Sequence, residues 1–581
     1  MKTPLPESEQ PQTETEYTLL GYLSQLYGGG NAPRLAKLLL RKVERQRIHA
    51  LAQSQPAQPL TENDILLITY ADTLIQDNIK PLQVLKKFAE RFLQPHFSGI
   101  HILPFFPFSS DDGFAVVDYT AVRADLGNWR DINILGEKFD LMFDLVINHC
   151  SREHIWFTDF ITGRLPGRDY FIALPADTDT RAVVRPRNTP LLNAVETYEG
   201  TRHVWATFSD DQIDLNFANP DVLCRFVEIL FNYVDQGAKL IRLDAIAFLW
   251  KQVGSNCMSL LETHLVVKIL RLLLEYSGAN VRLLTETNVP HAENVSYFGQ
   301  HDEAHMVYQF SLAPLLVMSY LFNDGRHLHS WAAALEPAPQ GCAYLNFIAS
   351  HDGIGLRPLE GLVPEPQIKK LIDITHDRGG FVSLRTGDDG KQTPYELNIA
   401  LFSAFGGKAE NIPAYVGAHQ LLLGFQGVPA LYLRALLGAQ NDRNAVEETG
   451  RTRSVNRGHL KYQPLVEQLD TSDNVQSQIY KALTHSLRLR KQQPAFSPEA
   501  RQTVLGDHPQ SFALLRECRE QQILVLASFS PSPQRINISA LLGHPLQADI
   551  KDLITEASYN TTMPAELAPF QTIWFELKTF S

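Results

Sequence analysis

The sequence predicts an α/β protein: a (β/α)8 TIM barrel with inserted loop subdomains after strands 3 and 7 and a C-terminal antiparallel β domain. Eight short apolar runs alternate with amphipathic segments, which is typical of a parallel sheet covered by helices. Polar residues follow several of these runs, at the face of such barrels that carries active sites. With 581 residues and 44% hydrophobic content, the chain has enough apolar material for a large core.

The first sixty residues are expected to form a helical extension, 1–60, in front of the barrel. Residues 1–16 are polar and acidic and predict disorder, whereas Tyr17–Gln55 carries apolar residues at helical spacing. No basic start precedes an apolar run, so we expect no signal peptide. The longest apolar stretch, Phe310–Phe322, has about 13 residues and contains Pro314, so it is too short to span a bilayer.

The eight apolar runs are expected to be the barrel strands, within residues 61–500. About 90 residues separate the third run from the fourth, and about 80 separate the seventh from the eighth. These long excursions predict a subdomain at about 150–212 and a lid region at about 353–426. The runs are Ile65–Tyr70, Gly99–Phe105, Leu141–Ile147, Leu240–Ala245, Arg282–Thr287, Val307–Ser311, Leu345–Ala349 and Pro429–Leu433.

The tail, residues 501–581, has a different pattern. Short stretches such as Phe512–Leu515, Ile523–Phe529 and Thr572–Leu577 alternate apolar and polar residues, as antiparallel strands do. We therefore expect a small antiparallel β domain packed on the barrel.

Charge and cysteine content exclude some classes of function. A net charge of −12 argues against a general nucleic-acid binder, which would present a basic face. The five cysteines are scattered without a CxxC pair, which favours reduced thiols and a cytoplasmic location. We expect neither nucleic acid nor membrane as a partner.

Four polar clusters at the ends of runs carry the candidate chemistry. They are Asp144–His149, Arg242–Asp244, Glu286 and His351–Asp352. Because the carboxyl ends of barrel strands converge, three carboxylates should meet in one pocket. Two carboxylates suit glycoside chemistry, where one attacks or stabilises an oxocarbenium-like centre and the other transfers a proton. Arg242 lies two positions before Asp244, so both side chains share a face and the cation favours the ionised carboxylate.

Each of these residues also has a simpler explanation. Asp244 could cap a helix, Glu286 could be solvated, and His149 and His351 could be packed histidines. The histidines and Asp352 could instead bind a divalent ion. No HxH, HExxH or acidic loop accompanies them, so we expect no metal and no organic cofactor.

These segments resemble those of the α-amylase superfamily, glycoside hydrolase family 13, and more narrowly the sucrose phosphorylase subfamily. The likeness extends over most of residues 60–490. The matching segments are Ile68–Asp72, His101–Phe105, Asp111–Phe114, Leu126–Trp129, Asp144–His149, Arg185–Arg187, Gln212–Asn216, Ile241–Ala245, Glu286, Ser350–Gly355 and Gly361–Pro364.

The resemblance implies a role for each matching residue. Asp244 would be the nucleophile, Glu286 the general acid and then base, and Asp352 the transition-state stabiliser. The other residues implied to bind substrate are Arg242, His149 and His351 in the glucose subsite, Asp72 and Arg457 at its far end, and Gln212 and Arg187 at the rim.

One departure points to a particular branch of the subfamily. Sucrose phosphorylases usually carry His where this chain has Tyr119, and the Tyr pattern is similar to that of amylases generally and of the glucosylglycerate phosphorylase branch. Tyr119 would then stack on the sugar or be a packed aromatic residue. Arg378, Arg385 and Lys391 follow run seven, where a basic loop could receive phosphate or an acceptor carboxylate. Arg385 is our candidate for the acceptor carboxylate.

The resemblance implies a retaining α-glucoside phosphorylase that releases α-glucose 1-phosphate, with 2-O-α-glucosylglycerate as the expected substrate. Its partners would be a small-molecule glucoside and inorganic phosphate, in a monomer or homodimer. The alternatives are a glucosylglycerol, sucrose or sucrose 6-phosphate phosphorylase, a hydrolase or transglucosidase on the same scaffold, or a non-catalytic amylase-like binding subunit. The last is disfavoured because all three carboxylates are present.

Overall fold

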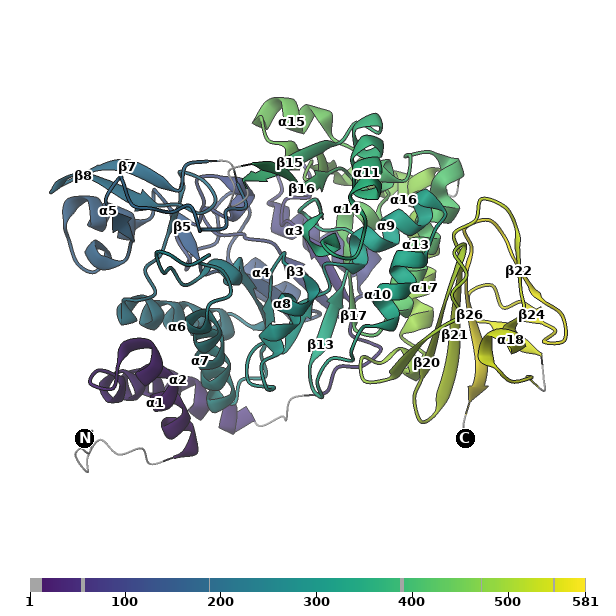
Figure 1. Cartoon of the computed structure of the whole chain (residues 1–581), viewed down its shortest axis with the longest axis horizontal. Coiled ribbons are helices and arrows are strands. Elements are labelled where there is room, and N and C mark those ends of the chain that lie inside the picture. Colours follow the sequence, from purple (N-terminus) through teal and green to yellow (C-terminus); the bar gives the residue numbers. More distant parts are fainter. Residues whose placement is uncertain are drawn as a thin grey trace.

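A closed barrel of eight parallel strands forms the centre of the molecule (Figure 1). The computed structural model describes residues 13–53, 58–187, 189–386, 391–471, 473–546 and 549–579. Each predicted run overlaps one barrel strand, so the predicted (β/α)8 barrel is confirmed. Around the barrel the strands are β1 (Leu66–Thr69), β3 (Gly99–Ile102), β4 (Asp140–Val146), β10 (Ala238–Asp244), β11 (Arg282–Thr285), β12 (Met306–Tyr308), β13 (Ala343–Asn346) and β17 (Val428–Tyr432).

The strands are nearly continuous apolar runs because helices cover their outer faces while side chains fill the barrel. In β4, only Asp140 at the start is exposed. The covering helices are α3 (Pro81–Phe88), α4 (Trp129–Gly136), α6 (Pro220–Asp235), α7 (Leu261–Ser277), α9 (Leu312–Phe322), α10 (Arg326–Ala333), α13 (Ile412–Gly424), α16 (Tyr462–Asp470) and α17 (Val475–Arg490).

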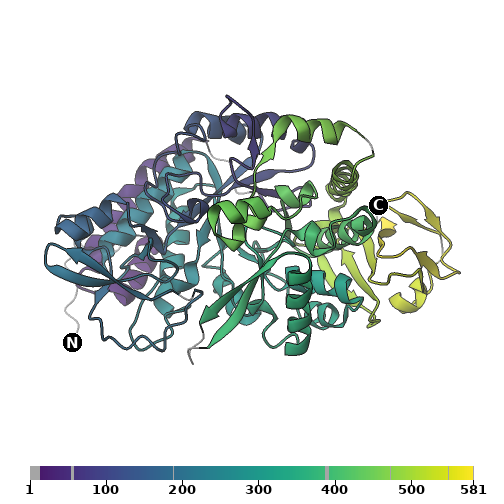
Figure 2. The same ribbon diagram turned by 90° about the horizontal axis from the view of Figure 1, so that it is seen from above.

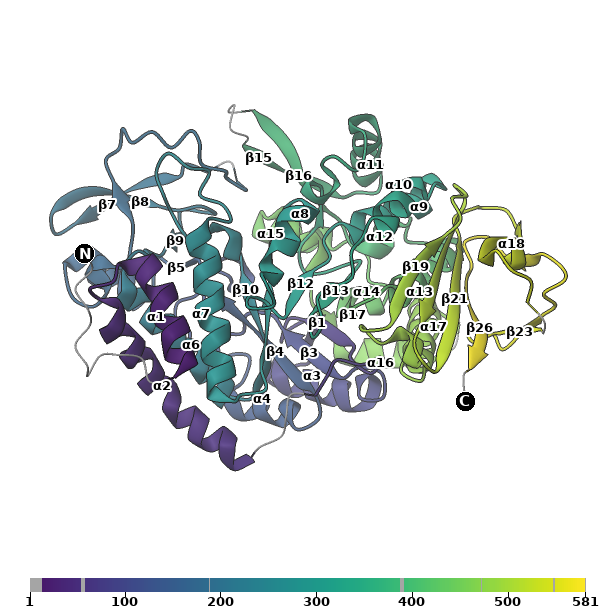
Figure 3. The ribbon, with the colours of Figure 1, turned by 60° about the horizontal axis from the view of Figure 1, so that its bottom comes forward.

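Two insertions rise from the carboxyl ends of the strands (Figure 3). Between β4 and α6 lie β5 (His149–Ser151), α5 (Ile155–Thr162), β6 (Ala173–Leu174), β7 (Leu192–Thr197), β8 (Gly200–Trp205) and β9 (Gln212–Asp214). Between β13 and α13 lie β14 (Ile354–Gly355), α11 (Glu365–Asp377), β15 (Phe381–Thr386) and β16 (Gln392–Asn398), with sheet order β14-β16-β15.

The chain ends in a six-stranded sheet with the order β19-β20-β21-β26-β23-β24, seen at the yellow end of Figure 2. It begins at β19 (Arg501–Leu505), and its central hairpin is β20 (Ser511–Glu517) and β21 (Gln521–Ser528), paired with β26 (Thr572–Thr579). The last two strands of the sheet are β23 (Ile550–Asp552) and β24 (Ser558–Tyr559). Among the described residues this hairpin and β26 pair antiparallel, as predicted for the C-terminal region. Buried Arg516 donates to the carbonyl of Gly424 at 2.8 Å and so joins this sheet to α13.

Two N-terminal helices, α1 (Glu14–Tyr27) and α2 (Ala32–Gln53), pack against α6 and α7. Helix α1 begins inside the segment expected to be disordered, because Thr13 caps it by accepting a hydrogen bond from the Glu16 N–H at 3.2 Å. The rest of that expectation, residues 1–12, lies outside the described residues. Among the helices described, none is long and apolar enough to cross a membrane.

Candidate active site

The predicted polar clusters meet in one pocket at the carboxyl ends of the barrel strands. The space between its lining side chains, open solvent at the mouth included, is about 570 Å³. Eight of the twelve predicted site residues line it: His149, Arg187, Gln212, Arg242, Asp244, Glu286, His351 and Asp352. The other lining residues are Asp111, Phe114, Phe208, Ala245, Ala247, Phe248, Thr287, Asn288, Tyr395 and Arg453.

Arg242 is the cation at the base of this pocket. It is 2% exposed, and its Nη1 donates to Asp244 Oδ1 at 2.7 Å and to the carboxylate of Asp144. Its Nη2 lies 3.8 Å from Glu286 Oε2. Burial alone would raise the pKa of Asp144, but His101 and Arg242 lower it to about 2. Asp144 is therefore a fixed anion that holds Arg242 in place.

Asp244 and Glu286 share one electrostatic environment. Burial raises the pKa of Asp244, Arg242 opposes that rise, and the negative charge of Glu286 adds to it. Burial also raises the pKa of Glu286, again against the effect of Arg242. Two acids so close together and so deeply buried retain a proton between them more readily than two isolated acids.

The backbone after Asp244 turns sharply and brings these two acids together. Ala245 has φ 51°, in the left-handed region that a residue with a side chain rarely adopts. Its N–H donates to Glu286 Oε2 at 3.0 Å. A strained residue that binds a functional carboxylate is typical of active sites.

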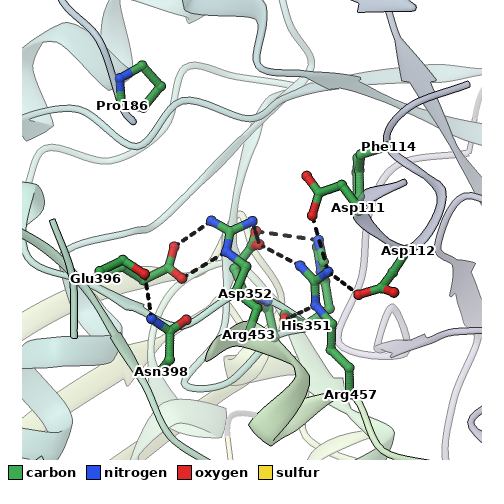
Figure 4. Close-up of polar contacts among 12 residues, drawn as sticks. Asp111, Asp112, Phe114, Pro186, His351, Asp352, Glu396, Asn398, Arg453 and Arg457 are labelled. Carbon is green, nitrogen blue, oxygen red and sulfur yellow. Dashed lines mark hydrogen bonds and ion pairs between the residues drawn. The ribbon is translucent and has the colours of Figure 1, made fainter. Parts of the chain in front are cut away.

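Asp352 is held between two arginines (Figure 4). Its Oδ1 lies 2.7 Å from Arg453 Nη1 and 3.4 Å from Arg457 Nη2. Although burial would raise the pKa of Asp352, Arg453 and then His351 lower it far below its usual range. Arg453 in turn forms a two-point ion pair with buried Glu396 of β16, at 2.9 and 2.6 Å.

The sequence motifs did not identify Arg453 and Glu396 as site residues. Arg453 lies four residues before Arg457 in Arg451–Arg457, and this spacing on one short helical segment was the available signal. Glu396 falls within β16, far in sequence from the carboxyl end of any barrel strand. Its place in the sequence therefore gave no reason to expect it in the site.

Histidines and an aromatic ring form another wall of the pocket. Phe114 stacks on His351 with 5.2 Å between ring centroids and 8° between planes. Burial lowers the pKa of His351 to about 3, so this ring is neutral at pH 7. Gln212 Nε2 lies 3.1 Å from His149 Nε2, and burial lowers the pKa of His149 as well. The wall therefore offers neutral polar groups and a flat apolar face.

Tyr119 does not line the pocket, and its buried position agrees with the second expectation for it, a packed aromatic residue. Its hydroxyl donates to the backbone carbonyls of Val146 and His149, and its ring packs among Trp156 and Phe226. The aromatic residue that this segment contributes is Phe114, five positions earlier. Burial of the Tyr119 ring behind β4 explains the difference.

Arg385 also lies outside the pocket. It is on β15, and its Nη2 donates to Glu360 Oε1 at 3.0 Å. Arg378 donates to the carbonyl of Ala404 instead of facing the site. Residues 387–390 of the expected basic loop lie outside the described residues. Besides Arg242 at its base, the arginines that line the pocket are Arg187 and Arg453.

Asp72 and Arg457 line a neighbouring pocket instead of the central one. Asp72 pairs with Arg123 at 2.9 Å, and Arg457 pairs with Asp112 at 2.7 Å. Arg457 also lies 3.4 Å from Asp352, which lines the central pocket.

A buried lysine lies behind His149. The ammonium of Lys251 is 2.7 Å from Asp214 Oδ2 and 2.6 Å from Asn148 Oδ1, and it also donates to the carbonyl of Phe248. Asp214 also accepts from the Thr207 hydroxyl at 2.6 Å. No group of three or more His, Cys, Asp or Glu residues arranged to hold a metal occurs in the described ranges.

Comparison with known proteins identifies the family. The family described as "Alpha amylase, catalytic domain" matches residues 94–352. Glucosylglycerate phosphorylase from Escherichia coli is 38% identical over 96% of this chain and 99% of its own length. That of Spirochaeta thermophila is 42% identical over 81% of each chain.

A solved structure agrees with these relatives. Sucrose 6F-phosphate phosphorylase from Thermoanaerobacter thermosaccharolyticum superposes with a TM-score of 0.72 at 25% identity, covering 82% of this chain and 96% of that one. The family predicted from the sequence motifs is confirmed, and so is the prediction of an enzyme. This chain belongs to the α-amylase family, and within it to the glucoside phosphorylases.

Proposed function

We propose that the enzyme cleaves 2-O-α-glucosylglycerate with inorganic phosphate and releases α-glucose 1-phosphate and glycerate. The observation that carries this proposal is the match to glucosylglycerate phosphorylases at 38% and 42% identity, against 29% for a sucrose 6(F)-phosphate phosphorylase and 28% for a glucosylglycerol phosphorylase. A cytoplasmic location suits this reaction, because phosphorolysis conserves the glucosidic bond as an intracellular sugar phosphate.

In the first half-reaction, Asp244 attacks C1 of the glucosyl group and the bond from C1 to the glycerate oxygen breaks. Glu286 gives its proton to that oxygen, so glycerate leaves and a β-glucosyl ester remains. Arg242 lies 2.7 Å from Asp244 but 3.8 Å from Glu286. The closer cation favours the ionised form of Asp244, so we assign the proton of the pair to Glu286.

In the second half-reaction, phosphate attacks C1 and the ester bond to Asp244 breaks. Glu286 accepts the proton of the incoming phosphate and is ready for another cycle. Asp352 stays ionised beside Arg453 and Arg457, so it can bind sugar hydroxyls and stabilise positive charge at the anomeric carbon.

The acceptor side of the pocket must receive an anion in both half-reactions, glycerate in one and phosphate in the other. Arg187 and Arg453 both line the pocket, but Arg453 is already paired with Asp352 and Glu396. We therefore propose Arg187 in place of Arg385 as the residue that binds the acceptor carboxylate.

A screen of acceptors tests this function. Purified enzyme is given α-glucose 1-phosphate together with D-glycerate, glycerol, fructose or fructose 6-phosphate, and released phosphate is measured. We expect glycerate to support the highest kcat/KM. A higher value with any of the other three would reject the proposed substrate and identify the enzyme as the corresponding phosphorylase.

A further inference from the structure

The N-terminal helices α1 and α2 lie beside α6 and α7 (Figure 3). Helix α1 contacts α7, while α2 contacts both α6 and α7. Leu19 and Leu23 of α1 are fully buried, so the contact is a packed one. Additional side-chain contacts fix it, including the ion pair between Lys42 and Glu228 and a hydrogen bond from Tyr276 to Glu44 at 2.9 Å. The proposed chemistry does not use this extension.

Tyr27, the last residue of α1, reaches two loops that are far apart in the sequence. Its hydroxyl donates to the carbonyl of Phe217 at 3.0 Å. Its ring centroid lies 6.4 Å from that of Trp250. Burial raises the pKa of Tyr27, so the hydroxyl stays protonated and able to donate. The Tyr27 side chain therefore contacts both the residues that follow β9 and the loop that follows β10.

Both loops lead to the wall of the catalytic pocket. Trp250 precedes Lys251, whose ammonium binds Asp214 of β9 and the side chain of Asn148. The Leu215 N–H also donates to the Asn148 carbonyl at 3.0 Å. Gln212 begins β9, and His149 follows Asn148 in the sequence. These two residues line the pocket, so a shift of either loop would move them.

We infer that α1 is a positioning element of the active site and that Tyr27 is the residue through which it acts. Tyr27 does not line the pocket and contacts no proposed catalytic group, so it is a positioning residue. Through its contacts with Phe217 and Trp250, it fixes the positions of Asp214, Lys251 and Asn148 relative to one another. The kinetic part of the following test rests on the proposed function, whereas the exchange measurement does not.

The matched control lies on the same helix. Tyr22 donates to Asp302 at 3.3 Å, and Asp302 pairs with Lys268 of α7 and does not line the pocket. Tyr22→Phe and Tyr27→Phe each remove one hydroxyl and one hydrogen bond. If the substitutions only weaken the packing of α1, the kinetic constants of both variants should change alike. If Tyr27 positions the pocket, only those of Tyr27→Phe should change.

Two measurements decide the matter. With D-glycerate as acceptor, Tyr27→Phe should raise the KM for α-glucose 1-phosphate about 3- to 10-fold, the effect of one lost neutral hydrogen bond, and Tyr22→Phe should change it less than about 2-fold. Tyr27→Ala, which also loses the ring contact, should have a larger effect than Tyr27→Phe. Amide hydrogen exchange in residues 212–217 and 248–251 should be faster in Tyr27→Phe than in wild type or Tyr22→Phe.

Equal kinetic changes in the two Phe variants, or an unchanged KM in Tyr27→Phe, would overturn the inference. If Tyr27→Ala does not fold, the Phe pair alone decides. If the wild-type enzyme does not use glycerate, the proposed function fails, and the exchange measurement still tests the role of Tyr27. Equal exchange in the Phe variants would then reject that role.

Discussion

At the residue scale, catalysis depends on which of the two acids, Asp244 or Glu286, carries the proton. Both acids are buried beside one guanidinium, and the nearer carboxylate is that of Asp244. An acid whose pKa is raised above its usual value remains protonated further toward neutral pH. Glu286 can therefore act as the proton donor while Asp244 attacks.

Glu286→Gln should reveal this role through pH and leaving-group dependence. In wild type, kcat/KM for phosphorolysis should fall as the pH rises through the elevated pKa of Glu286, because the proton donor is lost. The variant should lack that alkaline limb and lose about 10²- to 10⁴-fold activity on the natural glucoside. On α-glucosyl fluoride, whose leaving group needs little protonation, kcat/KM should fall little, because kcat/KM reports the first step and not the breakdown of the ester.

Paired pH profiles of wild type and variant check this prediction. An equal loss on the fluoride and on the natural glucoside would contradict the acid role of Glu286, and so would an unchanged alkaline limb.

Arg187 and Arg385 provide a second test at the same scale, because only the first lines the pocket. Arg187→Ala should lower kcat/KM for glycerate about 10- to 100-fold, the effect of losing a charge-assisted hydrogen bond. Glycerol, which lacks the carboxylate, should lose far less. Arg385→Ala is the control and should leave the preference for glycerate over glycerol unchanged.

Initial rates of glucoside synthesis with the two acceptors give the comparison. If Arg385→Ala altered the preference more than Arg187→Ala, the acceptor site would lie under the β15–β16 hairpin.

At the element scale, the strands were predictable and the long-range pairings were not. Barrel strands are buried on both faces, so β4 and β10 read directly as apolar runs with functional residues at their ends. Position alone predicted that Asp244 and Glu286 would meet in one pocket, because the carboxyl ends of the barrel strands converge. Arg453 was missed because its partner Asp352 is about a hundred residues earlier, and no local pattern marks such a contact.

The same limit explains why the positions of Tyr119 and Arg385 could not be predicted. Tyr119 and Phe114 lie in one segment, and a sequence cannot show which aromatic ring faces the pocket and which packs behind it. The direction of Arg385 depends on Glu360, a residue that belongs to a different element. Side-chain direction outside regular strands depends on tertiary contacts that sequence periodicity does not record.

At the scale of the whole molecule, the barrel and its first insertion meet at the buried ammonium of Lys251. It joins Asp214 of β9 to Asn148 at the end of β4. An ammonium group of the chain itself thus binds the oxygen atoms at this junction.

We therefore expect activity to survive exhaustive treatment with EDTA. The cations that the site needs are supplied by Arg242, Lys251 and the arginines around Asp352. Phosphate release and the melting temperature should both be unchanged after chelation and gel filtration. A loss of activity that Ca²⁺ or Mg²⁺ restored would contradict this expectation, and it would require a new interpretation of His149.

Direct detection of the glucosyl ester on Asp244 tests the whole account. In Glu286→Gln, α-glucosyl fluoride should still glucosylate Asp244, but the ester should turn over slowly because no base assists the second step. Acid quenching followed by peptide mass spectrometry should then find one glucosyl unit on the peptide containing Asp244, and none when Asp244→Asn is added to the variant. The absence of an adduct, or an adduct on another residue, would contradict double displacement through Asp244.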